Sequence, residues 1–323
     1  MSKVNSYLSL IKFSHTIFAM PFALIGFALG IQFSRPLVGC FWAMNEANSD
    51  PHNILWKSYF SEGKGFVTVF DWKLVALKLI LVIACMIFAR SAAMAFNRYL
   101  DRHFDAKNPR TAIREIPSGI ITSRNALLFT IACSVLFVAT TFFINRMCFY
   151  LSPVALAVIL GYSYTKRFTP LCHLILGLGL SLAPIGAFLA VTGVFELIPL
   201  LFSFAVIFWV SGFDIIYALQ DEEFDRSQKL YSMPVAMGKE DALKLSEFLH
   251  MLSALCIIGA GWLGNFSYLF WAGACVFAGM LIYQHRIVKP NDLSRVNIAF
   301  MTANGIASVV FAVFVIADLF IRF

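Results

Sequence analysis

The stretch from Arg90 to Gly119 carries residue types that suit a metal-bridged phosphate. On a helix, Asn97, Asp101 and Asp105 stand at positions i, i+4 and i+8, so their side chains share one face. Carboxylates with this spacing lie about 6 Å apart along the axis, which is close enough to share a hydrated cation. Arg90 lies seven residues before Asn97, two turns back on the same face. We therefore expect an acidic site with a guanidinium beneath it, at the end of an apolar helix.

A second acidic segment begins at Asp214 and continues through Tyr217, Asp221 and Asp225. Its three aspartates stand at i, i+7 and i+11 and again share one helical face. Asp214 falls within an apolar run, where a carboxylate is costly unless it faces the interior of a helical bundle. Tyr217 is three residues further on, close enough to bond the Asp214 carboxylate or an oxygen of a ligand.

The two acidic segments together predict a magnesium site. Either segment alone is explained equally well by solvated charge at a membrane edge. Two of them at matched depth, each with its acids on one face, favour a shared binding site. Because like charges this close repel strongly, cations are needed to neutralise them. Magnesium fits best, since it takes oxygen ligands, retains water and bridges carboxylates to phosphates, and the sequence has no His or Cys cluster for a softer metal.

The rest of the chain must hold these segments in a membrane. Of its 323 residues, 60% are hydrophobic and only 13% are charged, which is too apolar for a soluble fold. The pattern predicts an all-α, polytopic membrane protein with about nine transmembrane helices in a lipid bilayer. The predicted spans are residues 11–33, 74–97, 126–144, 147–165, 171–193, 197–219, 242–262, 266–285 and 297–320.

The distribution of basic residues orients this bundle. The formal net charge of +7 does not indicate a nucleic-acid partner, because the basic residues crowd the connections after spans two, four, six and eight. The positive-inside rule places those connections and the N-terminus in the cytoplasm. We expect a multi-pass protein of a bacterial-type inner (cytoplasmic) membrane, with both acidic segments on the cytoplasmic side.

Two regions have simpler interpretations. The long connection at residues 34–73 holds Trp42, Trp56 and Tyr59, and we interpret it as an extracytoplasmic flap at the membrane interface in preference to a functional lid. The fifth span is rich in small residues, including Gly177, Gly179 and Gly186. Close helix packing and a local kink at a proline would explain them.

Several of these segments resemble motifs of the UbiA family of intramembrane aromatic prenyltransferases. Asn97–Asp105 resembles the family's NxxxDxxxD motif, and Arg110–Gly119 resembles the R-T-x-x-R-x-x-P-S-G tail that follows it. Asp214–Asp225 resembles DxxYxxxDxxxD, and Tyr162–Arg167 resembles the basic loop after the fourth span. With the family-like opening Ile11–Gly26, the resemblance covers nearly the whole chain. The long first connection departs from it, on the side away from the motifs.

The resemblance implies a single domain over residues 1–323, in which the helices surround a central cavity for a polyprenyl diphosphate. Family members transfer the prenyl group to an aromatic ring and release pyrophosphate. Bridging cations and arginines would stabilise the leaving group, and an apolar bundle would keep the carbocation from water. By position, the resemblance implies that magnesium is held by Asn97, Asp101, Asp105, Asp221 and Asp225, with Asp214 either a metal ligand or a partner of Tyr217.

The remaining site residues follow in the same way. Arg90 joins the four metal-binding aspartates as an expected catalytic residue, and Tyr217 is a substrate contact. The candidates to bind the diphosphate are Arg90, Arg110, Arg114, Lys166 and Arg167. His15 is a candidate to touch the aromatic acceptor, although a histidine at a helix end is more often an interfacial polar residue.

The acceptor itself stays open. We favour 4-hydroxybenzoate or a related aromatic acid precursor of ubiquinone or menaquinone, because the FDIIYALQDEEFD segment resembles family members of quinone pathways. Other family members act on chlorophyllide, haem or a lipid phosphate. A transporter for an anionic lipid or metabolite is the alternative from another class, since it too would carry buried charges. The absence of an evident inverted repeat disfavours it.

Overall fold

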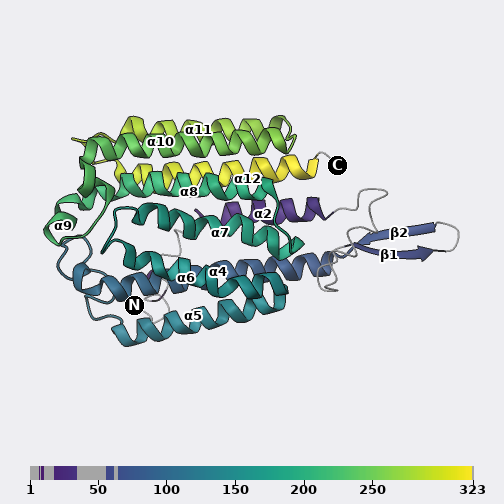
Figure 1. Ribbon diagram of the computed structural model, residues 1–323, viewed down its shortest axis with the longest axis horizontal. Coiled ribbons are helices and arrows are strands. Elements are labelled where there is room, and N and C mark those ends of the chain that lie inside the picture. Colours follow the sequence, from purple (N-terminus) through teal and green to yellow (C-terminus); the bar gives the residue numbers. More distant parts are fainter. Residues whose placement is uncertain (1–6, 8, 11–17, 35–55, 62–64, 322–323) are drawn as a thin grey trace.

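The chain folds into a bundle of long helices (Figure 1). The computed structural model describes residues 7, 9–10, 18–34, 56–61 and 65–321, and of residues 56–70 only the paired backbone of two strands. In chain order the helices are α2 (Met20–Phe33), α4 (Trp72–Asp105), α5 (Ser123–Ile144), α6 (Arg146–Thr165), α7 (Cys172–Thr192), α8 (Leu197–Ala218), α9 (Glu222–Ser227), α10 (Met233–Leu263), α11 (Tyr268–Ile287) and α12 (Asn304–Ile321). A short 3₁₀ turn, η3 (Leu219–Asp221), follows α8, and a π-helix, η4 (Ile298–Ala303), precedes α12.

The helical membrane fold expected from composition is confirmed. Within the described ranges, seven helices are long and apolar enough to cross a membrane. The described part of the first predicted span, α2, and the eighth span, α11, lie alongside them in the bundle without meeting that criterion of length and apolarity (Figure 1). The chain is therefore a multi-pass membrane protein, with each helix satisfying its own backbone hydrogen bonds.

Among the described elements, only the two strands in the connection before α4 are not helical. Strands β1 (Trp56–Ser61) and β2 (Gly65–Phe70) pair as an antiparallel hairpin, in which Trp56 is opposite Phe70. The sequence prediction of a flap at the membrane interface did not include this hairpin. The β-branched and aromatic residues of GFVTVF are typical of a strand.

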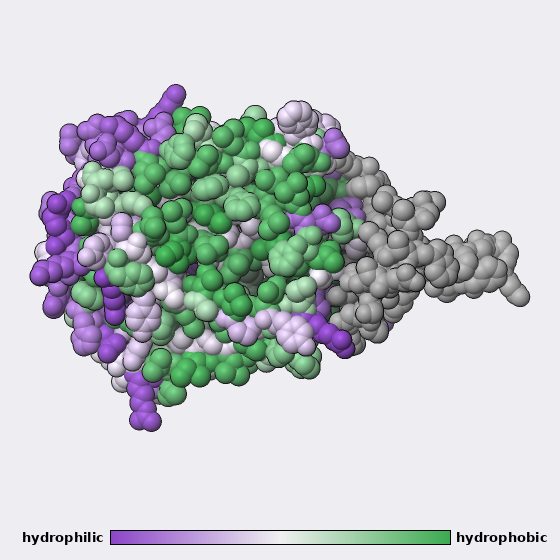
Figure 2. Space-filling view, in the orientation of Figure 1, coloured by the Kyte–Doolittle hydropathy of each residue, from purple (hydrophilic) through white to green (hydrophobic). Residues whose placement is uncertain are grey.

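The polar connections gather at one end of the bundle. Because successive helices run in opposite directions, the segments that follow α4, α6, α8 and α11 lie at the same end, where α9 is also found (Figure 1). Figure 2 shows hydrophilic side chains concentrated at that end and hydrophobic side chains over the middle of the molecule. This arrangement brings the ends of α4 and α8, with their acidic residues, into the same polar layer.

Aromatic packing fixes the frame behind that layer. Trp209 of α8 is fully buried, and its ring centroid lies 5.3 Å from Phe22 of α2 and 5.7 Å from Phe277 of α11. On its other side α2 packs closely against α7, where a Cβ on Gly26 would lie only 2.0 Å from the Pro184 carbonyl oxygen. Only glycine allows so close an approach of the two backbones. Helix α2 is therefore held between α7 and α8, which carry part of the site.

Candidate functional site

A polar cavity of about 270 Å³ lies at the end of the bundle where α4 and α8 finish. It collects eleven of the twelve residues selected from the sequence as site residues, the exception being Arg90. They are Asn97, Asp101, Asp105, Arg110, Arg114, Lys166, Arg167, Asp214, Tyr217, Asp221 and Asp225. Segments as far apart in the chain as α4 and α9 thus contribute to one chamber.

The first acidic segment is a continuous helical face, as its spacing predicts. The Asn97 amide Nδ2 donates to Asp101 Oδ2 at 3.1 Å, an i, i+4 contact within α4. Asp101 Oδ1 also lies 3.5 Å from Arg167 Nη2, and Asp105 Oδ1 accepts from Arg114 Nη1 at 2.7 Å. The carboxylates of α4 are therefore held by arginines from the two connections that follow α4 and α6.

The second acidic segment is not one continuous helix, which corrects the sequence prediction. Helix α8 ends at Ala218, and the chain makes the 3₁₀ turn η3 before α9 begins. Asp221 stands at the N-cap of α9, and Asp225 lies in the first turn of this new helix, where its charge complements the helix dipole. The carboxylates still converge, because the turn keeps both side chains on the cavity wall.

Basic residues from other segments also hold this second group. Arg110 reaches across from the α4–α5 connection and binds Asp221 through both Nε and Nη2. Lys166 Nζ lies 2.8 Å from Asp225 Oδ1, and the Asp225 side chain is only 1% exposed. The four aspartates expected to bind the metal, Asp101, Asp105, Asp221 and Asp225, are thus each paired with an arginine or lysine that the sequence had assigned to the diphosphate.

Asp214 and Tyr217 do not bond each other, although the sequence had suggested such a contact. His173 Nδ1 lies 2.6 Å from Asp214 Oδ2, whereas the Tyr217 hydroxyl accepts from Arg110 Nη1 at 2.8 Å. Asp214 points toward α7 because His173 there offers it a buried partner. Tyr217 is turned toward the α4–α5 connection, and the Phe300 ring packs against it at 4.3 Å.

The two basic residues that bind Asp221 and Asp225 remain cationic at neutral pH. Burial lowers the pKa of Lys166, but the charge of Asp225 and its hydrogen bond raise it by more, so the net direction is upward. Burial also lowers the pKa of Arg110, and the Asp221 and Tyr217 side chains again raise it by more. The cavity therefore presents fixed positive charge beside its carboxylates.

Two unpartnered oxygens make this chamber suitable for a divalent cation. Asp105 Oδ2 and Asp225 Oδ2 are buried and have no hydrogen-bond partner among the described residues. A buried anionic oxygen without a partner is costly, and a hard cation with water and phosphate oxygens would satisfy it. Within the described ranges no three acidic, His or Cys side chains are close enough to hold a metal by themselves. The donor set therefore fits an ion such as Mg²⁺, which retains water and takes substrate oxygens.

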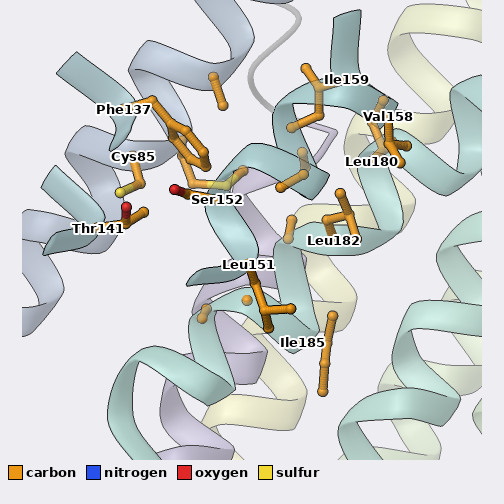
Figure 3. A pocket seen from close by; sticks show the side chains of 18 of the residues that line it. Cys85, Phe137, Thr141, Leu151, Ser152, Val158, Ile159, Leu180, Leu182 and Ile185 are labelled. Atoms are coloured by element: carbon orange, nitrogen blue, oxygen red, sulfur yellow. The ribbon is translucent and has the colours of Figure 1, made fainter. Parts of the chain in front are cut away.

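A second cavity, of about 340 Å³, adjoins the first on the side of the middle of the bundle. The two cavities share Met94, Tyr162 and Leu176 in their walls. Figure 3 shows the apolar character of the second cavity, with Phe137, Leu151 and Leu180 directed into it from three different helices. We call it the apolar cavity, and the first one the polar cavity.

Arg90 lines the apolar cavity and not the polar one, which places it deeper than the motif carboxylates. Its Nε is buried and has no hydrogen-bond partner among the described residues. Tyr162 and Met94, which lies one turn further along α4 than Arg90, line both cavities. The guanidinium is thus a positive group near the boundary between the polar and apolar chambers, available to an anionic ligand.

The apolar cavity owes part of its space to glycines of α7. A Cβ on Gly179 or Gly186 would meet no atom within 4 Å, and both residues line the cavity. Gly177 does serve close packing, since a Cβ there would lie 2.5 Å from the Ile207 carbonyl oxygen. The expectation of close packing is therefore correct for Gly177 and wrong for the other two.

The cavity also reaches the lateral surface of the bundle. Val154 of α6 and Phe195, just after α7, line it and are 61% and 51% exposed. Side chains so exposed on a membrane-spanning surface face lipid. A long apolar chain could therefore extend from the cavity into the bilayer.

Sequence reasoning missed His173 and Asn108. Asn108 Nδ2 lies 3.4 Å from Asp221 Oδ1, but an asparagine in a charged connection gives no distinctive signal. His173 did have a recognisable sequence signal, because it is an ionisable residue at the start of an apolar span. His15, the candidate for an acceptor contact, lies outside the described residues.

Comparison with known proteins gives one consistent result. The sequence profile of the UbiA prenyltransferase family matches residues 65–306. The 4-hydroxybenzoate octaprenyltransferase of Tolumonas auensis is 30% identical over 239 residues, which cover 73% of this chain and 83% of that protein. The enzyme of the same name from Nitrosospira multiformis is 28% identical over 72% of this chain and 80% of its own length.

Solved structures agree with the fold. A UbiA homologue from Aeropyrum pernix, in its apo form, superposes with a TM-score of 0.72 at 26% identity, covering 95% of this chain and 98% of that one. A UbiA homologue from Archaeoglobus fulgidus, bound to DMAPP and Mg²⁺, gives a TM-score of 0.65 at 20% identity, covering 97% and 99%. With two acidic motifs facing each other across a polar cavity inside a helical membrane bundle, this chain belongs to the UbiA prenyltransferase family and is a membrane-embedded prenyltransferase.

Proposed function

We propose that this enzyme transfers a polyprenyl group from a polyprenyl diphosphate to an aromatic acid, with Mg²⁺ bound in the polar cavity. The bond between the allylic carbon and the diphosphate oxygen breaks, a bond to a ring carbon forms, and the ring loses a proton. The products are the prenylated aromatic acid, pyrophosphate and a proton. The observation that carries the proposal is that a charged chamber adjoins an apolar one, with Met94, Tyr162 and Leu176 in the walls of both.

The polar cavity suits the diphosphate. Asn97, Asp101, Asp105, Asp221 and Asp225 would hold Mg²⁺, which when bound would neutralise charge on the leaving pyrophosphate. Arg110, Arg114, Lys166 and Arg167 now pair with the carboxylates. Because an arginine or lysine binds a phosphate as readily as a carboxylate, these side chains can turn to the diphosphate as it enters.

The apolar cavity suits the prenyl chain. Each methylene buried there is favoured by about 0.8 kcal/mol, and the walls exclude water from the allylic carbon. The exposed side chains of Val154 and Phe195 at its margin give the rest of a long chain access to lipid. The cavity therefore accepts the donor substrate without requiring the whole chain to be enclosed.

The acceptor is proposed to be 4-hydroxybenzoate or a related quinone precursor. The curated relatives named above carry 4-hydroxybenzoate in their names, and this supports the assignment. Arg90, whose Nε has no hydrogen-bond partner among the described residues, lies near the boundary of the two cavities, where it could meet the acceptor's carboxylate or the diphosphate. A transporter, considered from the sequence, is set aside because the chain belongs to a family of transferases.

We also infer that residues 1–323 form one domain and that the polar cavity opens to the cytoplasm of a bacterial-type inner membrane. The packing of α2 against both α7 and α12 joins the beginning of the chain to its end and supports a single domain. The gathering of basic connections at the polar-cavity end supports the orientation.

The orientation predicts which positions an impermeant thiol reagent can reach. In a cysteine-free background, Tyr268→Cys should label in intact spheroplasts, because Tyr268 is 74% exposed at the end of the bundle opposite the cavity. Ser227→Cys, at the end of α9, should label only after the membrane is permeabilised. The reverse pattern would invert the topology.

Activity should depend on the acidic residues and on a divalent cation. Asp101→Asn and Asp225→Asn should each lower turnover on the order of 100-fold or more, because a neutral amide binds Mg²⁺ too weakly against its hydration. Chelation of the metal in the parent enzyme should abolish product. The measurement is mass spectrometry of membranes incubated with a polyprenyl diphosphate and 4-hydroxybenzoate.

The matched control for the acidic variants is Asp241→Asn. This side chain is 63% exposed on α10 and pairs with the surface residue Lys244. It should retain parental activity. Full turnover in chelated membranes, or equal activity of all three variants, would contradict the metal site.

Arg90 should require its bidentate guanidinium. Arg90→Lys keeps the charge but loses the two parallel N–H donors of the guanidinium. We therefore expect a folded protein whose activity is lower by about tenfold or more. A rise in KM for the acid alone would assign Arg90 to the acceptor, and a rise for the prenyl diphosphate alone would assign it to the donor. Arg146→Lys, exposed at the opposite end of α6, is the control. If both Arg90→Lys and Arg90→Ala turn over like the parent, Arg90 has no part in catalysis.

The glycines of α7 should influence the prenyl chain length that the enzyme accepts. Gly186→Leu would place a side chain in the apolar cavity, so the ratio of kcat/KM for a long over a short prenyl diphosphate should fall about tenfold. Gly161→Leu is a matched control, because a Cβ there also meets no atom within 4 Å but the residue lines neither cavity. An unchanged chain-length preference in Gly186→Leu would exclude the apolar cavity as the prenyl site.

A further inference from the structure

A buried histidine that lies outside the acidic motifs ties three helices together at the polar cavity. His173, at the start of α7, is only 3% exposed. Its Nδ1 lies 2.6 Å from Asp214 Oδ2 on α8, and its Nε2 lies 3.3 Å from the backbone nitrogen of Met233, the first residue of α10. The His173 carbonyl also accepts from Ser211 Oγ at 3.1 Å. The ring is therefore fixed from two sides and cannot turn freely.

These contacts assign the tautomer of the ring. A backbone N–H can only donate, so Nε2 must carry the lone pair that accepts from Met233. The proton of a neutral imidazole then lies on Nδ1 and is donated to Asp214.

Asp214 has a different kind of partner from the other carboxylates of the site. Asp101, Asp105, Asp221 and Asp225 each pair with an arginine or lysine, and those side chains are 23–35% exposed. Such partners can leave for a diphosphate. The His173 ring is buried and anchored to the α10 backbone, so it cannot. Asp214 is thus held in one place while its neighbours are free to exchange partners.

The second oxygen of Asp214 is left for a ligand. Oδ1 has no hydrogen-bond partner among the described residues, and the side chain lines the polar cavity with 24% exposure. Asp214 lines the polar cavity, Arg90 lines the apolar cavity, and Tyr162 lies in the wall of both, so an acid and a guanidinium lie on either side of the boundary of the two cavities. An aromatic hydroxy acid presents a hydroxyl donor and an anionic carboxylate that match these two groups in chemistry.

We propose that His173 is a positioning residue that fixes Asp214 Oδ1 as a hydrogen-bond acceptor for the hydroxyl of the aromatic acceptor. This inference rests on the proposed function. It assigns His173 no contact with the diphosphate or the metal, and its effect passes through Asp214.

Two substitutions test the two hydrogen bonds of the His173 ring separately. His173→Asn places an amide N–H near the position of Nδ1, so it preserves the donor to Asp214 and loses the acceptor for Met233. His173→Gln places an amide oxygen near the position of Nε2, so it preserves the acceptor and loses the donor. Both variants are compared with the parent at equal amounts of folded protein, with thermal stability in detergent measured for each.

We expect a change in the kinetic constants for the aromatic acceptor alone. His173→Gln should lower kcat/KM for 4-hydroxybenzoate about tenfold or more, while KM for the prenyl diphosphate stays at the parental value. His173→Asn should retain most of the activity. In an Asp214→Asn background, His173→Gln should cause no further loss, because the interaction it removes is already absent.

Other outcomes would overturn the inference. Equal losses in both variants, or a larger loss in His173→Asn, would assign His173 to the attachment of α10 alone. Parental activity in His173→Gln would show that the donor to Asp214 is dispensable. A rise in KM for the prenyl diphosphate would place Asp214 on the donor side. Failure of the parent enzyme to prenylate any aromatic acid would instead overturn the proposed function, so the two failures are distinguishable.

Discussion

The structure depends on how charge is neutralised inside an apolar bundle. A carboxylate away from water is costly unless a cation or several hydrogen bonds compensate it. At the polar cavity this compensation comes from segments distant in the chain, such as Arg110 for Asp221 and Lys166 for Asp225. The pairs close the cavity end of the bundle, yet their basic members are partly exposed. The same interactions therefore stabilise the fold and leave a set of cations able to receive a diphosphate.

The sequence revealed those features of the site that arise from local periodicity. The i, i+4 spacing of Asn97 and Asp101 predicts a shared helical face, and the two side chains are hydrogen-bonded within α4. The break after Ala218 was not predictable, because no glycine or proline marks the 3₁₀ turn. The pairing of Asp214 with His173 was equally unpredictable, since the two residues are distant in the sequence and no spacing pattern connects them. Periodicity reports neighbours along one helix and is silent on pairing between helices.

The small residues of α7 show a second limit of sequence reasoning. Gly177 and Gly179 are two positions apart in the same span, and composition gives both the same interpretation. One lies against the α8 backbone and the other against empty space in the apolar cavity. A missing side chain serves either close packing or an open volume, and only the position of the neighbouring helix decides between them. For the fold class, by contrast, hydropathy was sufficient, because a long apolar segment in a bilayer must satisfy its own backbone hydrogen bonds as a helix whatever its neighbours are.

The fixed part of the site extends into the core through Asn304. This buried side chain accepts from Trp209 Nε1 and Gln284 Nε2, and donates to the carbonyls of Ala299 and Phe300. The carbonyls belong to the π-helix η4, whose altered bonding leaves backbone groups that need such a partner.

The π-helix η4 connects this hydrogen-bonded core to the cavity wall. Phe300 packs on Tyr217, and Tyr217 in turn accepts from Arg110. On this side of the cavity, groups anchored in the aromatic core meet a basic residue from a polar connection. His173 and Asp214 form a second anchored pair, held from α10. The site thus combines a rigid wall, which can orient an acceptor, with exchangeable ion pairs, which can admit and release a diphosphate.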